Sequence, residues 1–194
     1  MDNILGYIVE QLTIKNPLHS KKIKKNLKRF DEAYYNRANV FLKKYVGLLK
    51  NDNKTLDHAI DCYLCMLADV NYETMQFAQT GAYTSQSFEE VNQRVYNNPE
   101  VMEYYMHGLL LSQFLWTHHY EILLWFNKVI QCNINGIQNY LEVGGGHGLY
   151  LSEAIGIIGE KTKYDVVDIS ESSLRIAQKM VDNGRATYLH ANIF

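Results

Sequence analysis

The sequence predicts an α/β protein in two parts: an all-helical domain over residues 1–132, then the first βαβαβ half of a doubly wound parallel sheet over residues 137–194. Three observations predict this division. Apolar residues recur at helical spacing through the first part, with no strand alternation. In the second part short apolar runs alternate with amphipathic segments, and a glycine-rich turn joins the first run to the segment after it. We expect the sheet to be incomplete.

The helical part begins with elements that apolar periodicity and capping residues delimit. They are a helix from Asn3 to Leu12 that ends before Pro17, one long helix or two in line from about Ser20 to Lys50, and a helix capped by Asn53 or Thr55 that runs towards Gly81. Basic residues from Lys21 to Arg29 are interleaved with apolar ones at helical spacing. We interpret this segment as the solvated face of an amphipathic helix rather than a nucleic-acid or lipid patch, because the whole chain carries a net charge of only -2.

Two further helix starts follow. Ser87 to Glu90 has the form of a capping box and predicts a short helix to Tyr96, while Asn98 and Pro99 form an N-cap with proline at the first helical position. The uncharged run from Tyr104 to Tyr120 predicts a buried core helix. It does not predict a membrane span, because polar residues interrupt it and it is shorter than the roughly 20 apolar residues that a span needs.

The second part is predicted to alternate strands and helices. Its expected elements are a strand ending at Val143, a helix over Leu149–Ile158, a strand over Tyr164–Ile169, a helix capped by Ser170 that runs to Val181, and a strand from Ala186 to His190. Parallel strands of this kind bring ligand-binding residues together at their carboxyl ends.

The turn after the first strand carries an acid and three glycines at every second position: Glu142, Gly144, Gly146 and Gly148. Glycine lets backbone approach a ligand closely, and the helix that follows directs its free N–H groups at the turn. Asp168 lies about 20 residues further on, where such folds place an acid that binds ribose hydroxyls. A dinucleotide fingerprint fails, because Leu149 stands where it needs a small residue, and no P-loop occurs.

This pattern resembles the first motif of class I S-adenosylmethionine-dependent methyltransferases, acid-x-Gly-x-Gly-x-Gly. The resemblance covers roughly residues 137–194 and implies that S-adenosylmethionine, or its product S-adenosylhomocysteine, contacts a set of residues on three strand ends. That set is Glu142, Gly144, Gly146, Gly148, Asp168, Ile169 and Asn192. In the family the first acid orients the methionine ammonium, the second binds the ribose, and the position of Asn192 meets the adenine. His147 is expected to start a helix near the cofactor.

The resemblance implies methyl transfer to an O, N or C nucleophile of a small-molecule acceptor, and the helical part is weakly similar to that of small-molecule O-methyltransferases. We expect residues 1–132 to form a lid, substrate or dimerisation domain that lends a Tyr or His to the acceptor pocket, with Tyr105 and His107 as first candidates. The family's sheet has later strands that these residues do not include. We therefore expect an N-terminal part of a longer enzyme, inactive alone, or a sheet completed by another copy.

The cysteines and the charge of the chain limit its possible location, partners and metal sites. Three cysteines and no basic start followed by an apolar stretch predict a reduced, cytoplasmic protein, and we expect no membrane and no nucleic-acid partner. His58, Cys62 and Cys65 share one helix face, but no fourth ligand follows nearby, so no metal site is predicted. Two other functions stay open: a non-catalytic helical interaction module with a vestigial cofactor turn, and a nicotinamide- or flavin-dependent oxidoreductase.

Overall fold

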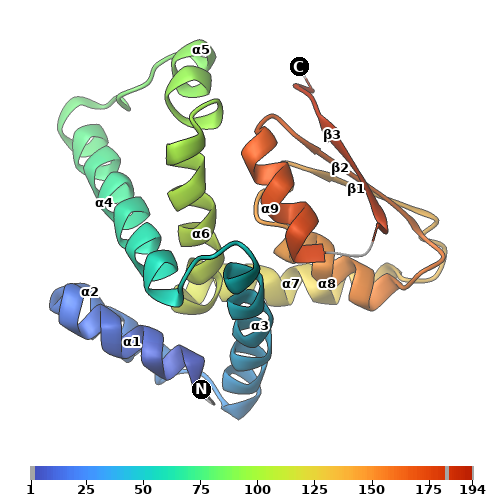
Figure 1. Ribbon diagram of the computed structural model, residues 1–194, viewed down its shortest axis with the longest axis horizontal. Coiled ribbons are helices and arrows are strands. Elements are labelled where there is room, and N and C mark those ends of the chain that lie inside the picture. Colours follow the sequence, from blue (N-terminus) through green and yellow to red (C-terminus); the bar gives the residue numbers. More distant parts are fainter. Residues whose placement is uncertain (1–2, 182–183, 194) are drawn as a thin grey trace.

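The computed structural model describes residues 3–181 and 184–193, and most of them are helical (Figure 1). In chain order the helices before the sheet are α1 (Ile4–Lys15), α2 (Pro17–Leu27), α3 (Glu32–Asn51), α4 (Leu56–Thr80), α5 (Phe88–Val91), the π-helix η1 (Asn92–Tyr96), α6 (Pro99–Leu115) and α7 (Thr117–Asn133). The remaining elements are β1 (Asn139–Val143), α8 (Leu149–Ile158), β2 (Lys163–Asp168), α9 (Glu171–Val181) and β3 (Ala186–His190). A mixed α/β fold is therefore confirmed.

The first helices differ from the expected boundaries. α1 continues past Leu12 to Lys15, and the stretch expected from Ser20 to Lys50 is two helices, the first of which already begins at Pro17. They are separated at residues 28–31, where the Asp31 carboxylate accepts a hydrogen bond from the backbone N–H of Tyr34 and so caps α3. The Tyr35 hydroxyl donates to the Leu27 carbonyl, 2.9 Å away, and satisfies the last turn of α2.

Local capping signals later in the chain are confirmed. The Thr55 hydroxyl, rather than Asn53, caps α4 by accepting from the N–H of His58, and Gly81 ends that helix with a φ of +73°. Asn98 caps α6 by accepting from the N–H groups of Glu100 and Val101. Each cap satisfies backbone N–H groups that a helix start otherwise leaves unpaired.

The uncharged run from Tyr104 to Tyr120 is not one helix. It divides at Trp116, whose extended backbone separates α6 from α7. The break lets the Trp116 indole N–H donate to the hydroxyl of Tyr63 on α4, 2.7 Å away. A contact with a residue so distant in sequence explains why local pattern did not reveal the break. No helix among the described residues is both long and apolar enough to cross a membrane.

The described part of the sheet has three parallel strands in the order β1-β2-β3. Leu141 pairs with Asp165, which pairs with Thr187, and this register continues along all three strands. α8 and α9 lie on one face of the sheet (Figure 1). Alternate β2 residues Tyr164 and Val166 are buried against them, as the two-residue period of a strand requires.

On the other face, the large apolar side chains of Leu141, Val143 and Leu189 are exposed.

Two apolar clusters form the core, and each contains residues from both sides of the boundary expected at residue 132. The larger is helical but includes Leu149 of α8 and Met180 of α9. The smaller covers the sheet and includes Ile130 of α7. The helical part and the sheet part are therefore packed together through side chains from both, and the carboxyl ends of the strands lie close to α6.

Candidate functional site

A cavity of about 520 Å³ lies at the carboxyl ends of all three strands. The strand ends, the loops that follow them and the first turn of α9 contribute these residues to its wall: Val143, Gly144, Gly146, Val167, Asp168, Ile169, Ser173, Ala191, Asn192 and Ile193. Helices of the first part supply the rest of the wall: Phe88, Tyr96, Met102, Met106 and Leu109. The cavity therefore sits between the two parts of the chain, where ligand sites commonly form.

Five of the seven residues that the resemblance assigns to a cofactor line this cavity: Gly144, Gly146, Asp168, Ile169 and Asn192. The other two, Glu142 and Gly148, do not. The structure gives each of these two residues a different role.

The glycines of the turn have two different structural roles. Gly144 and Gly146 have φ of +72° and +53°, in the left-handed region that favours glycine. A Cβ on Gly144 would meet no atom within 4 Å, so the missing side chain leaves open space beside the cavity. Gly148 serves packing instead. A Cβ there would lie 2.7 Å from the Cα of Ala177, so only glycine lets α8 begin this close to α9.

Asp168 joins the end of β2 to the glycine turn. Its carboxylate is only 7% exposed and accepts hydrogen bonds from the backbone N–H of Gly146, at 3.0 Å, and of Ser170, at 2.8 Å. A carboxylate has about four lone-pair positions, so two remain for a ligand diol. These two bonds hold the acid in place at the cavity wall before any ligand arrives.

Glu142 is a second acid near the turn, and its chemistry differs. The Tyr140 hydroxyl donates a hydrogen bond to its carboxylate over 2.6 Å. Burial nevertheless raises the pKa of Glu142 to about 7, and the negative charge of Asp168 adds to the rise. Near neutral pH this carboxyl group is therefore partly protonated, whereas an exposed glutamate is ionised.

His147 is buried within the turn rather than presented to the cavity. Its Nδ1 accepts a hydrogen bond from the backbone N–H of Leu149, 3.2 Å away, at the start of α8. Burial lowers the pKa of His147 to about 4, with a smaller contribution from His119. The imidazole is thus neutral at pH 7 and satisfies one of the N–H groups that the helix start leaves unpaired.

A second cavity, of about 770 Å³, adjoins the first and shares four wall residues with it: Tyr96, Met102, Met106 and Leu109. Its other side chains come from α4, α6 and the segment between them, and several are tyrosines, including the expected candidate Tyr105. The Tyr104 hydroxyl donates to the carboxylate of Asp69 over 2.5 Å, and Arg94 pairs with Glu73 at 2.8 Å. The cavity is mainly apolar with a few polar groups, as small-molecule sites are.

Sequence reasoning missed Asp69, Glu73 and Arg94 as residues of this second cavity. The acidic pair lies four positions apart on α4, a spacing that places both on one helix face and was available as a signal. The other expected candidate, His107, lines neither cavity. It is 5% exposed and faces α3 and α4, where its Nδ1 lies 2.5 Å from the hydroxyl of Tyr45.

The three cysteines form no disulfide with one another. Cys62 is buried, whereas Cys65 and Cys132 are exposed. Among the described residues, the group of potential metal ligands that converges is His58, Glu103 and His107, which includes neither Cys62 nor Cys65. No protein-family model matches the chain, and a search of curated proteins finds no matching relative.

Proposed function

We propose that this chain belongs to an enzyme that transfers a methyl group from S-adenosylmethionine to a small-molecule acceptor. The observation that carries the proposal is the first cavity, where a glycine turn, an ordered acid and an amide-bearing loop from three successive strand ends share one wall. The acceptor would lie in the second cavity, which shares four side chains with the first.

The residues at the first cavity fit this cofactor. A volume of about 520 Å³ lies within the roughly 300–1,000 Å³ of small-molecule sites. The two free lone-pair positions of Asp168 suit a vicinal diol, and the open side of Gly144 accommodates a chain laid against the backbone. The carboxylate of Asp168 at the cavity wall also favours a ligand with positive charge.

The bound cofactor would supply an activated methyl group to an O, N or C nucleophile. The protein's part is to orient the reactants and exclude water. Asp168 and the glycine turn form the sheet side of the site, while Met102, Met106 and Leu109 of α6 form an apolar cover. Tyr105, next to Met106 in the chain, lines the second cavity and carries a hydroxyl that can hydrogen-bond to an acceptor.

Thermal unfolding with added S-adenosylhomocysteine tests the cofactor assignment. A ligand at about 100 times its Kd stabilises the native state by about 2.7 kcal/mol, which raises the Tm of a chain of this size by roughly 5–10 °C. We expect this rise in the wild type and its loss in Asp168→Asn. The matched control is Asp165→Asn, which changes the same residue type on the same strand outside the cavity.

Each outcome decides between functions. A rise with NAD⁺ and none with S-adenosylhomocysteine would assign an oxidoreductase. No rise with either ligand at millimolar concentration would favour the non-catalytic helical module. A rise that survives Asp168→Asn would place the ligand elsewhere.

A further inference from the structure

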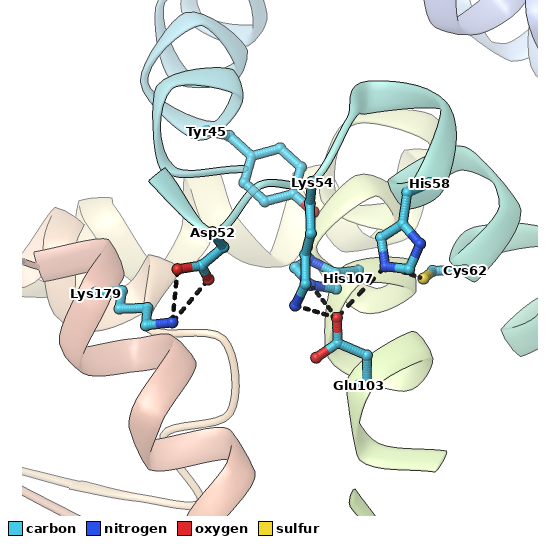
Figure 2. Close-up of polar contacts among 8 residues, drawn as sticks. All are labelled: Tyr45, Asp52, Lys54, His58, Cys62, Glu103, His107 and Lys179. Atoms are coloured by element: carbon cyan, nitrogen blue, oxygen red, sulfur yellow. Dashed lines mark hydrogen bonds and ion pairs between the residues drawn. The ribbon is translucent and has the colours of Figure 1, made fainter. Parts of the chain in front are cut away.

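Two pairs of potential metal ligands face each other across α4 and α6, away from both cavities (Figure 2). His58 and Cys62 lie four residues apart on α4, and Glu103 and His107 lie four residues apart on α6. Residues at this spacing share a helix face, so each helix presents two side chains to the other.

The backbones approach closely enough to bring these faces together. A Cβ on Gly108 would lie 2.8 Å from the Cβ of Met66 and 3.3 Å from the carbonyl oxygen of Cys62. The glycine therefore permits an α4–α6 distance that a larger residue would prevent. It follows His107 directly in the chain and sets the position of that imidazole against α4.

One carboxylate oxygen lies at the centre of the cluster. Glu103 Oε1 is 3.1 Å from His107 Nε2 and 3.4 Å from His58 Nε2, and the three ligand atoms all lie within 4.8 Å of one another. In a tetrahedral zinc site with bonds of about 2.0–2.1 Å, neighbouring nitrogen and oxygen ligands are about 3.3 Å apart. Two of the three ligand separations thus already have the length that such an ion requires.

The outer contacts also suit an ion. A ligating imidazole usually donates its second N–H to an oxygen, which fixes the ring. The Tyr45 hydroxyl lies 2.5 Å from His107 Nδ1, and both side chains are buried. His58 has a side chain 43% exposed, which gives an ion access from solvent. Two histidines and one acid are a frequent ligand set for zinc with a fourth position open to water.

The ammonium group of Lys54 now contacts the same oxygen of Glu103. It is a cation bound to the carboxylate oxygen that would ligate a metal, so this oxygen already attracts positive charge. Lys54 lies on the short loop before α4 and its side chain is 28% exposed, so its long stem can turn to solvent when an ion binds.

We propose that His58, Glu103 and His107 bind a divalent transition-metal ion of the zinc class that links α4 to α6. Both helices line the second cavity, through Asp69 and Glu73 on one side and Tyr104 and Tyr105 on the other. The ion therefore holds two walls of that cavity at a fixed separation. The proposal is independent of the methyl-transfer assignment, because it concerns neither the glycine turn nor Asp168.

Metal titration of the chelator-treated full chain tests the site. The probes are Zn²⁺ in calorimetry and Co²⁺ in visible absorption, since the visible spectrum of bound Co²⁺ depends on whether its coordination is tetrahedral. One ion per chain is expected, with at least tenfold weaker binding in His58→Ala and in Glu103→Gln. His58 is exposed enough for its variant to fold. His118→Ala is the matched control, because it removes an exposed histidine from a helix that does not supply a ligand.

A variant of the competing cation separates a metal site from a simple ion-pair network. Lys54→Met removes the ammonium group from Glu103, so metal binding should become several-fold tighter. If Glu103 only paired with Lys54, the same variant would lose stability and gain no metal affinity. The proposal is wrong if the wild type shows no saturable binding, or if His58→Ala and His118→Ala bind equally well.

Discussion

The backbone N–H of Gly146 donates a hydrogen bond to the carboxylate of Asp168 over 3.0 Å, and so ties the glycine turn of β1 to the end of β2. The two residues are 22 positions apart in the chain. The bond positions the turn before a ligand binds, which lowers the entropy that binding must overcome. A substitution of Asp168 would therefore disturb the glycine turn as well as remove a ligand-binding carboxylate.

The first prediction concerns Gly148. Gly148→Ala should lower the free energy of unfolding by roughly 2–4 kcal/mol, because φ is +76° and the new Cβ would lie 2.7 Å from Ala177 Cα. Gly156→Ala is the control on the same helix, where nothing lies within 4 Å and the substitution should stabilise by about 0.5–1 kcal/mol. Urea denaturation measures both. Equal effects would show that Gly148 is not a packing glycine.

The second prediction concerns the buried imidazole of His147. Its pKa is lowered from 6.5 to about 4, so the unfolded chain takes up the proton first as pH falls. The group therefore contributes stability that is present above pH 6.5 and is lost between pH 6.5 and 4. At about 1.4 kcal/mol for each pKa unit, the upper limit is about 3 kcal/mol.

His147→Asn removes this titration and keeps an oxygen that can accept from the N–H of Leu149. The stability advantage of the wild type over the variant should shrink as pH falls from 7 to 4. Chemical denaturation at several pH values measures it. An advantage independent of pH would contradict a buried, neutral histidine.

The third prediction has the opposite sign. Burial raises the pKa of Glu142 from 4.5 to about 7, so the native state holds the proton more tightly than the unfolded chain. Its contribution to stability is full below pH 4.5 and is lost as pH rises through 7. The upper limit is again about 3 kcal/mol.

Glu142→Gln mimics the protonated acid and should therefore be increasingly more stable than the wild type as pH rises from 4.5 to 7. The stability of the wild type minus that of Glu142→Gln should fall as pH rises, whereas the same difference for His147→Asn should rise. Parallel curves for wild type and Glu142→Gln would show that the carboxyl group is as well solvated as an exposed glutamate.

The fourth prediction concerns the start of α6. Asn98→Ala should cost about 1 kcal/mol, because the side chain accepts from two backbone N–H groups that would otherwise lose their partner. Asn97→Ala, one residue earlier at an exposed position, is the control and should cost less than about 0.5 kcal/mol. Guanidinium denaturation distinguishes them. A similar loss in both variants would argue against a specific cap.

Local chemistry explains what the sequence could predict. The starts of α4 and α6 follow from the side chains of Thr55 and Asn98, since an N-cap bond spans only two or three residues. The strand from Ala186 to His190 was predicted with the boundaries that the structure shows. For the two helix starts, the deciding interactions lie within the segment itself.

Contacts between distant segments explain what it could not. The break at Trp116 depends on a hydrogen bond to Tyr63, and the group at Glu103 depends on how α4 and α6 pack. The resemblance indicated five of the fifteen residues around the first cavity. It did not reveal that Glu142 and Gly148 are absent from the cavity wall, because strand periodicity says which residues share a face and not which of them border a cavity.

α6 borders both cavities and brings Glu103 and His107 to α4. Ten of its 17 residues are buried, among them Gly108, Ser112 and Gln113. A helix that is buried on most of its surface has few positions where a substitution leaves packing unchanged. In a saturation mutagenesis experiment, α6 should therefore tolerate fewer replacements than α2, whose basic face is open to solvent.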